Sequence, residues 1–221
     1  VSQNLQVKEY KMIEIQGVNK AYHGYPVLSN VSMKLECGEV VGFVGANGSG
    51  KTLLLKTICG FIQPDRGRVL FEGKQIGKEI DFPPETGIMI EEPGFYQAYS
   101  ARQNLRLLAS HRGRLNDQQV DAAIASIGLD ASSRKPVGKY SMGMRQRLCF
   151  AQAVMEQPTL LILDEPFNSL DQKWADWLRE EIKRYSSPKR LILLTSHRKE
   201  DIDLLCTRTF LFVNGKVSSD K

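Results

Sequence analysis

The stretch Gly45-Ala46-Asn47-Gly48-Ser49-Gly50-Lys51-Thr52 decides the fold of this chain and its central chemistry. It matches the pattern G-x-x-x-x-G-K-[ST] at every fixed position. The short, largely apolar segment 39–44 precedes it and is predicted to be a buried strand, and residues 51–59 have the length and composition of a helix. A strand, a glycine-rich turn and a helix N-terminus in this order predict a phosphate-binding loop, and therefore a nucleotide site.

The chemistry of this loop follows from its residue types. The glycines let successive backbone N–H groups turn inward around anionic oxygens, so all of residues 45–52 are expected to surround the phosphates. Lys51 adds a positive charge that reaches the β- and γ-phosphates, and the Thr52 hydroxyl is a ligand for Mg²⁺. The alternative, a Gly/Ser-rich loop that binds nothing, is disfavoured because both flanking elements also match.

The composition limits the possible classes of protein. The chain has 221 residues, 42% hydrophobic and 25% charged, which is typical of a globular protein. No run approaches the roughly 20 apolar residues of a membrane-spanning helix. The four cysteines are far apart, without the spacing of a metal or redox motif. The net charge of +5 is compatible with nucleic acid or an anionic membrane, but the basic residues are scattered and favour a solvated surface.

Apolar runs alternate with helical patterns along the chain, which predicts an α/β fold with a mostly parallel sheet. A β-rich N-terminal part and an inserted helical stretch over residues 100–129, with Asn116 as an N-cap, complete the pattern. The predicted strands are 12–18, 27–35, 68–71, 86–90, 160–163, 191–195 and a hairpin over 209–217, and the later predicted helices are 142–156, 172–185 and 199–205.

Polar groups that suit hydrolysis follow two of these buried strands. Asp164 and Glu165 come directly after residues 160–163, at the strand end where open α/β sheets bind ligands. Asp164 is predicted to hold Mg²⁺ and Glu165 to polarise a water against the γ-phosphate. His197 ends the next apolar run, and a contact with the γ-phosphate is geometrically plausible there.

Ser141 and Gly143 stand in the first turn of the helix predicted to begin at Met142. A serine at this position is ordinarily only an N-cap. An exposed helix N-terminus carrying Ser and Gly equally suits a phosphate, including one presented by another molecule. The spacing alone leaves both interpretations open.

With these motifs in this order, residues from about 12 to 217 resemble the ATP-binding subunit of an ABC transporter. The resemblance implies an ABC ATPase fold of the P-loop NTPase type. Tyr22 matches the aromatic residue that stacks on adenine, and Tyr140 to Met144 stand at the family signature. Ser169 to Asp171 match the D-loop, so Asp171 is expected near the nucleotide. Lys51, Glu165 and His197, the switch histidine, are the residues expected to act in hydrolysis.

The resemblance also implies an organisation and a set of partners. Residues 1–221 would form one domain, with a core and β subdomain over 12–92 and 158–217 and a helical subdomain over about 93–157. ATP and Mg²⁺ would be bound, the metal by Thr52, Asp164 and Glu91, which stands where the family has a glutamine. A second copy would pack head to tail, facing the phosphates with Ser141 and Gly143.

A separate membrane permease would hold this pair at the inner, cytoplasmic face of a bacterial membrane, with no nucleic acid expected as a partner. Phe95, Tyr96 and Tyr99 either help to form the docking groove for the permease or pack within the helical part. An ATPase that drives a soluble machine is the alternative function, but such relatives usually carry two ATPase units or a coiled-coil insert. A regulator without hydrolysis is disfavoured by Glu165 and His197.

Two departures from the family pattern are informative. The signature reads Tyr-Ser-Met-Gly-Met, and Glu91 adds a negative charge where a neutral glutamine is usual. Both features resemble the branch of bacterial ABC ATPases linked to bacitracin-type and lantibiotic resistance, which favours export.

Overall fold

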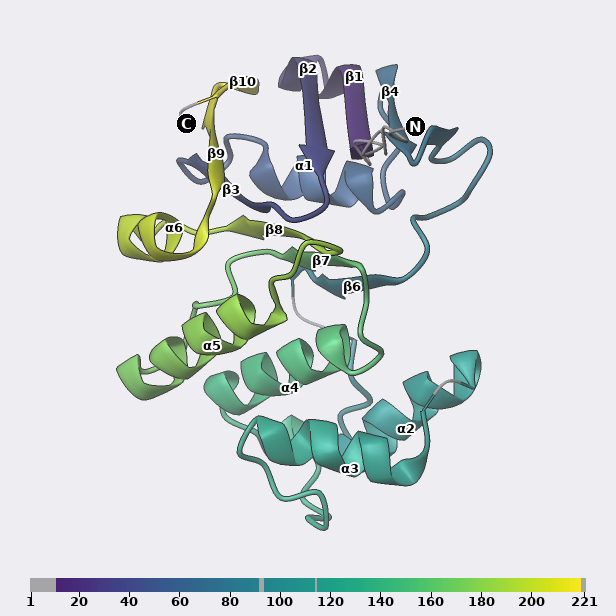
Figure 1. The fold of residues 1–221 in the computed structure, drawn as a ribbon, viewed down its shortest axis with the longest axis vertical. Coiled ribbons are helices and arrows are strands. Elements are labelled where there is room, and N and C mark those ends of the chain that lie inside the picture. Colours follow the sequence, from purple (N-terminus) through teal and green to yellow (C-terminus); the bar gives the residue numbers. More distant parts are fainter. Residues whose placement is uncertain (1–10, 92–93, 114, 220–221) are drawn as a thin grey trace, which may run out of the picture.

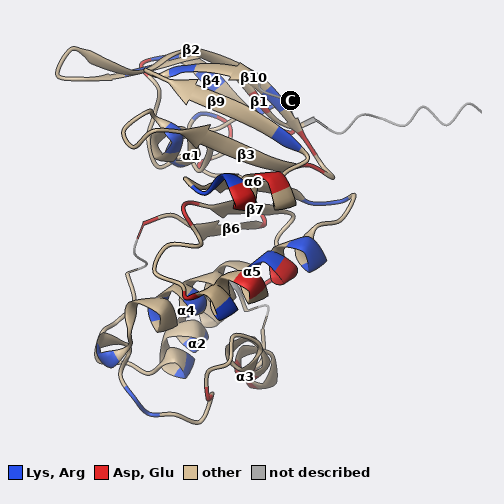
Figure 2. Ribbon diagram, turned by 90° about the vertical axis from the view of Figure 1, so that its left-hand side faces the viewer, with Lys and Arg blue, Asp and Glu red and all other residues tan. Residues whose placement is uncertain are grey.

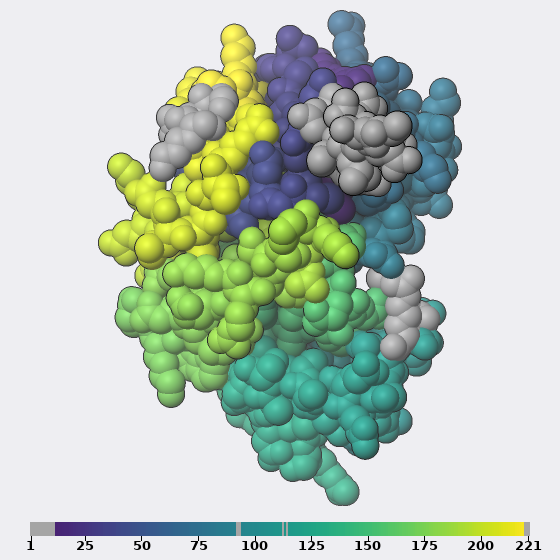
Figure 3. Space-filling view, viewed as in Figure 1, coloured from purple at the N-terminus to yellow at the C-terminus, as the bar shows by residue number. Residues whose placement is uncertain are grey.

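Two β-sheets and a helical segment make up the fold in a computed structural model, which describes residues 11–91, 94–113 and 115–219 (Figure 1). The first sheet is antiparallel and consists of β1 (Lys11–Tyr22), β2 (Tyr25–Glu36), β4 (Arg66–Phe71) and β5 (Lys74–Gln75), in the order β2-β1-β4-β5. The space-filling view shows that this first part of the chain and its C-terminal part form one end of the molecule, and the middle of the chain forms the other (Figure 3).

The second sheet has six strands in the order β10-β9-β3-β8-β7-β6, all parallel except β10. Its strands are β3 (Val40–Gly45), β6 (Thr86–Met89), β7 (Leu160–Leu163), β8 (Leu191–Thr195), β9 (Arg208–Val213) and β10 (Lys216–Ser219). Because β3, β7 and β8 are parallel neighbours, their carboxyl ends meet at one edge of the sheet. The chemistry predicted at the ends of these strands is therefore collected in one place.

Helices cover both faces of this parallel sheet. The helix α1 (Lys51–Ile58) lies between the two sheets, and four helices lie on the opposite face (Figure 1). These are α2 (Ala101–Arg112), α3 (Asp117–Ser126), α4 (Met142–Val154) and α5 (Gln172–Tyr185), and the short α6 (Lys199–Leu205) follows β8. Since α2, α3 and α4 come between β6 and β7 in the chain, the predicted helical insertion is confirmed.

Alternating side chains of the central strands enter two separate hydrophobic cores. In β8, Leu191 and Leu193 pack with α1 and the antiparallel sheet, whereas Ile192 and Leu194 pack with the helices on the other face. All four are fully buried. A parallel strand that is buried on both faces requires an unbroken apolar sequence, which is why β7 and β8 have the predicted bounds.

The strands β1 and β2 are longer than the predicted segments 12–18 and 27–35. Their pairing shifts register between Ile15 and Val18, and Gly17 between them has a φ of 57°. This β-bulge lets the strand continue to Tyr22, past the point where the alternation of apolar residues breaks. The turn at His23 and Gly24 then returns the chain. The bulge therefore carries Tyr22 beyond the predicted strand end.

The capping box predicted at Asn116 is confirmed, because its side chain accepts a hydrogen bond from Gln119 N and the Gln119 side chain accepts one from Asn116 N. The short β5 and a single 3₁₀ turn, Val137–Lys139, were not predicted from the sequence. Among the described residues, no helix is both long enough and apolar enough to cross a membrane.

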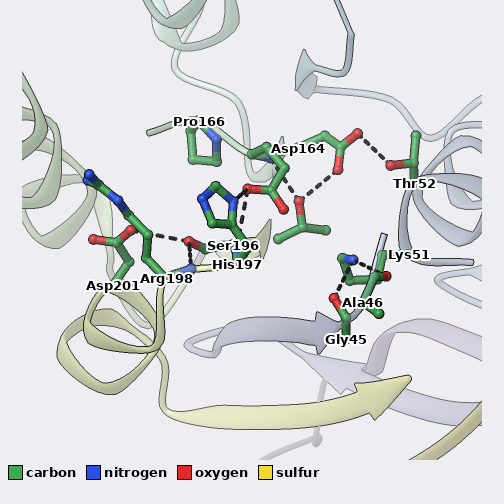
Figure 4. Close-up of polar contacts among 12 residues, drawn as sticks. Gly45, Ala46, Lys51, Thr52, Asp164, Pro166, Ser196, His197, Arg198 and Asp201 are labelled. Atoms are coloured by element: carbon green, nitrogen blue, oxygen red, sulfur yellow. Dashed lines mark hydrogen bonds and ion pairs between the residues drawn. The ribbon is translucent and has the colours of Figure 1, made fainter. Parts of the chain in front are cut away.

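A buried ion pair fastens α6 to α5. The Arg179 guanidinium donates to Asp201 Oδ1 from Nε at 2.8 Å and from Nη2 at 2.6 Å, and Asp201 is fully buried. The other oxygen of Asp201 accepts from Ser196 Oγ at 3.1 Å (Figure 4). Helices α5 and α6 both contain acidic and basic residues (Figure 2). The Arg179–Asp201 pair joins the two helices beside Ser196, the residue before His197.

Replacing Asp201 by Ala is expected to lower the free energy of unfolding by about 3 kcal/mol, because it leaves a buried guanidinium without its principal carboxylate. Urea unfolding followed by circular dichroism measures the change. The matched control is Glu180→Ala, which removes the exposed Glu180–Lys183 pair of α5 and should cost less than about 0.5 kcal/mol. Equal losses in the two variants would contradict a structural role for the buried pair.

Candidate active site

The loop between β3 and α1 is built to hold anionic oxygens. Gly50, the N-cap of α1, has a φ of 108°, and a Cβ on it would lie 2.7 Å from the carbonyl oxygen of Val27. No side chain caps this helix, so its first N–H groups stay available to a ligand. The hydroxyl of Ser49 is buried without a hydrogen-bond partner among the described residues. These unpaired donors predict a bound anion.

Lys51 lies within this loop. Its ammonium donates to the carbonyl oxygen of Gly45 at 2.8 Å and to that of Ala46 at 3.0 Å (Figure 4). The residue is buried, with 6% of its surface exposed. The side chain therefore curls back over the loop, where its charge faces the same space as the N–H groups of the loop.

A cleft of about 470 Å³ opens beside the loop. One part of its wall consists of Tyr22, Val27 and Ile62, and another of Asn47, Gly48, Gly50, Lys51, Thr52, Lys56 and Glu165. Tyr22 is 44% exposed, so the face of its ring is available to a flat ligand. A lining that combines aromatic and aliphatic side chains with a cationic, N–H-rich loop matches a purine base joined to a polyphosphate.

Asp164 links the end of β7 to two other elements. Its Oδ2 accepts a hydrogen bond from the Thr52 hydroxyl at 2.8 Å, and its Oδ1 accepts one from the Thr195 hydroxyl at 2.7 Å. Thr195 in turn accepts from the backbone N–H of Glu165 at 2.8 Å. Figure 4 shows Asp164 and Thr52 facing one another above the loop.

Oxygen donors of this kind fit Mg²⁺. A hydroxyl and a carboxylate are the ligand types that this ion takes, and it typically keeps several waters and substrate phosphate oxygens besides. The described residues contain no cluster of three or more His, Cys, Asp or Glu that could form a complete metal cage. The pair Thr52 and Asp164 therefore fits a metal that is bound together with a nucleotide.

Glu165 and His197 form a second pair at the same edge. His197 Nδ1 lies 2.8 Å from Glu165 Oε2, and the backbone N–H of His197 donates to the same oxygen at 3.4 Å. Since an ionised carboxylate only accepts, the Nδ1 atom carries the shared proton. Glu165 lines the nucleotide cleft whereas His197 lines a separate cavity beside α6, so the histidine reaches the cleft through Glu165.

Glu91 follows β6 and reaches the edge of the site. Its carboxylate forms an ion pair with Lys56 on α1. It also lines a second cavity, of about 300 Å³, together with Asp164 and Glu165. The structure thus brings Glu91 near the predicted metal ligands but pairs it with a lysine that the sequence analysis did not single out.

Two predicted residues, Ser141 and Asp171, are helix N-caps, and a third, Gly143, lies in the first turn of α4. The Ser141 hydroxyl accepts from Met144 N at 3.2 Å as the N-cap of α4, and Asp171 accepts from Trp174 N at 3.0 Å as the N-cap of α5. Gly143 packs near the Ser169 carbonyl, 3.2 Å from where a Cβ would stand. The helix α4 lies across the parallel sheet from α1 (Figure 1), and none of the three lines the described cleft.

The aromatic cluster divides into two parts. Phe95 is 6% exposed and belongs to the core of the helical part. Tyr96 and Tyr99 are 59% and 43% exposed, with ring centroids 5.3 Å apart. Packing within the helical part is therefore the outcome for Phe95, and docking of a permease on the two exposed tyrosines stays a prediction.

Comparison with known proteins identifies the family. Residues 28–168 match the family model described as ABC transporter. The chain is 35% identical over 210 residues to the ABC transporter ATP-binding protein YybJ of Bacillus subtilis, covering 95% of this chain and 96% of that protein. The chain belongs to the ABC transporter family. It is an ATP-binding subunit and an ABC ATPase, as the sequence predicted.

Relatives with more specific names are similarly close. The lantibiotic transport ATP-binding protein SrtF of Streptococcus pyogenes is 32% identical, with 95% of this chain and 90% of that protein covered. The bacitracin transport ATP-binding protein BcrA of Bacillus licheniformis is 31% identical, with 93% and 68% covered.

Solved structures agree on the fold. A structure of an ATP-binding subunit of an ABC transporter has a TM-score of 0.84 at 25% identity, covering 95% of this chain and 90% of that one. A dimeric ATP-binding cassette in a post-hydrolysis state, bound to ADP and phosphate, has a TM-score of 0.82 at 18% identity, covering 95% and 99%. The predicted ABC ATPase fold is confirmed.

Thr195, like Lys56, is a site residue that was not predicted from the sequence. It ends the otherwise aliphatic strand β8, is fully buried, and its hydroxyl holds both Asp164 and the backbone of Glu165. A single hydroxyl at the carboxyl end of a central apolar strand was the available signal.

Replacing Thr195 by Val is expected to lower kcat for ATP about tenfold to a hundredfold, because the ABC ATPase loses the group that positions both carboxylates. Steady-state hydrolysis and ATP binding are measured together, and binding should change little. The matched control is Thr57→Val on α1, where the buried hydroxyl donates only locally, to the carbonyl oxygen of Leu53. An unchanged kcat in Thr195→Val would remove this residue from the site.

Proposed function

We propose that the chain binds Mg·ATP in the cleft beside Tyr22 and hydrolyses it as one half of a head-to-tail pair that drives a membrane permease, in the direction of export. The observation that carries the proposal is the joined set of contacts Thr52–Asp164–Thr195 and Glu165–His197 beside the phosphate-binding loop. It provides metal ligands and a base within one cleft.

The loop supplies the binding of the phosphates. The N–H groups of residues 45–52 and the positive end of α1 surround the anionic oxygens, and Lys51 turns from the Gly45 and Ala46 carbonyls toward the β- and γ-phosphates. Tyr22 stacks on the adenine ring. Mg²⁺, held by Thr52 and Asp164 with Glu91 nearby, supplies positive charge that neutralises the phosphate oxygens.

Glu165 supplies the base for hydrolysis. Its carboxylate accepts a proton from the attacking water as the water oxygen bonds to the γ-phosphorus and the bond to the β-γ bridging oxygen breaks, which releases ADP and phosphate. His197, hydrogen bonded to the same carboxylate through Nδ1, holds Glu165 in its orientation toward the γ-phosphate. The side chain of His197 is 58% exposed, so its ring is accessible to a ligand.

The second copy completes the site. The exposed N-terminal turn of α4, with Ser141 and Gly143, is an anion-binding end that does not face its own cleft. In a head-to-tail pair it contacts the γ-phosphate held by the other copy, and Asp171 lies at the same interface. The dimeric arrangement of the similar cassette bound to ADP and phosphate supports this proposal.

The permease is a separate partner that holds the pair at the inner face of the cell membrane. The exposed rings of Tyr96 and Tyr99, which follow Glu91 in the chain, form part of its docking surface. Export of a peptide antibiotic is favoured because relatives over most of the chain are named as bacitracin and lantibiotic transport proteins.

Replacing Glu165 by Gln is expected to lower ATP hydrolysis by about 10²–10⁴-fold, because the amide cannot accept the proton of water. ATP binding should persist, and size-exclusion chromatography with Mg·ATP should show an enduring dimer. Glu180→Gln on the exposed face of α5 is the control and should behave as wild type. Full activity of the Glu165 variant would exclude the residue as the base.

Replacing Ser141 by Arg is expected to abolish hydrolysis and ATP-dependent dimerisation while a single chain still binds ATP. The added bulk and charge stand in the interface and not in the chain's own cleft. Ser126→Arg, at an exposed serine of α3, is the matched control. A loss of ATP binding by the monomeric Ser141 variant would show that the residue acts within its own chain.

A further inference from the structure

The cavity of about 300 Å³ between the end of β6 and the N-terminal turns of α4 has an unbalanced charge. Three carboxylates line it, those of Glu91, Asp164 and Glu165. Arg145 of α4 is the one cationic side chain among the described residues of its lining. Its Nε atom is buried and has no hydrogen-bond partner among the described residues. A guanidinium donor without an acceptor, next to three acceptors, is an uncompensated arrangement.

Glu91 is the most exposed of the three acidic residues that line this cavity. Asp164 is fixed by the hydroxyls of Thr52 and Thr195, and Glu165 by His197. The side chain of Glu91 is 63% exposed and an ion pair with Lys56 joins it to α1. Among the described residues, this ion pair is the contact recorded for its carboxylate, and its backbone adopts the left-handed region, with a φ of 58°. Such strain in a non-glycine residue recurs at segments that switch or clamp a ligand.

Lys56 belongs to the nucleotide cleft as well as to Glu91. It stands one helical turn after Thr52, on the same face of α1, and it lines the cleft beside the phosphate-binding loop. The polyphosphate of ATP carries several negative charges and competes with Glu91 for this lysine. When the phosphates attract Lys56, Glu91 loses its cation while the negative charge around it increases.

We propose that Arg145 is a positioning residue that receives the Glu91 carboxylate when ATP draws Lys56 away, so that Glu91 exchanges one cationic partner for the other. The exchange replaces a contact between β6 and α1 by one between β6 and α4, the helix that begins at Ser141. ATP in the cleft thereby fixes the position of the α4 N-terminus. The inference rests on the proposed binding of ATP in this cleft and adds to it the two residues that neutralise Glu91.

The test is a double-mutant cycle on ATP affinity. ATP is titrated calorimetrically into the full chain in EDTA, which removes any contribution of Glu91 to metal binding, and at low ionic strength, where charge effects are least screened. Four proteins are compared, namely wild type, Arg145→Gln, Glu91→Gln and the double variant. Arg145→Gln should weaken ATP binding about fivefold, the lower range of typical coupling between sites, because Glu91 then stays on Lys56.

The same substitution should have no effect in the Glu91→Gln background, since there is no carboxylate to receive. Arg145→Lys should restore the affinity because it keeps the charge. Arg134→Gln, an exposed arginine in the groove beside α3, is the matched control and should bind ATP as wild type does. Thermal unfolding of each variant is measured alongside its titration, to detect a loss of stability. If a single variant is unstable, the charge-reversed double variant Glu91→Lys with Arg145→Glu is measured instead, and it should bind ATP more tightly than either of its single variants.

Equal weakening by Arg145→Gln in both backgrounds, or no weakening in either, would overturn the partner exchange. Failure of the wild-type chain to bind ATP in a parallel titration with Mg²⁺ would instead contradict the proposed function. The two failures are distinguishable because the first requires measurable binding by the wild type.

Discussion

The Asp164 carboxylate is the contact on which the arrangement of this site depends. Its two oxygens accept hydroxyls from Thr52, in the first turn of α1, and from Thr195, at the end of β8. The phosphate-binding loop, the acidic pair after β7 and the histidine after β8 are thereby joined through one side chain. Because neither hydroxyl is charged, Asp164 keeps its full negative charge for a cation in the cleft. An ion pair in the same place would have satisfied the carboxylate and left it a weaker metal ligand.

Much of this arrangement could be predicted from the sequence, for physical reasons that differ between elements. The strands β7 and β8 are buried on both faces, so their apolar runs mark their bounds without ambiguity, and the acidic pair and His197 follow directly. The strand β1 is different, because the bulge at Gly17 interrupts the alternation while the strand continues to Tyr22. Tyr22 was reached through resemblance, because the alternation of residues stops before it.

Contacts between segments distant in the chain account for most of what was missed. The pairing of Glu91 with Lys56 joins β6 to α1, and nothing in either local sequence indicates the other. Thr195 was predicted only as the last residue of an apolar strand, because the sequence around it does not indicate which groups its hydroxyl contacts. The proposed roles of Ser141 and Gly143 depend on a second chain. In one chain they are an N-cap and a close-packed glycine, and a function for them requires a surface that another chain provides.

Backbone strain at the strand ends explains how the carboxylates of Glu165 and Glu91 are aimed. Glu165 follows Asp164 at the end of β7 with a φ of 48°, and Glu91 follows β6 with a φ of 58°, both in the left-handed region that disfavours residues with a Cβ. Such conformations cost of order 1–3 kcal/mol each and persist only where the surroundings determine them. At Glu165 the surroundings are visible, since Thr195 binds its backbone N–H and His197 its carboxylate. At Glu91 the surroundings include an ion pair with Lys56 of α1. The strain at Glu165 is therefore held by two neighbouring residues of the site, whereas that at Glu91 is held by an ion pair with a lysine that lines the nucleotide cleft.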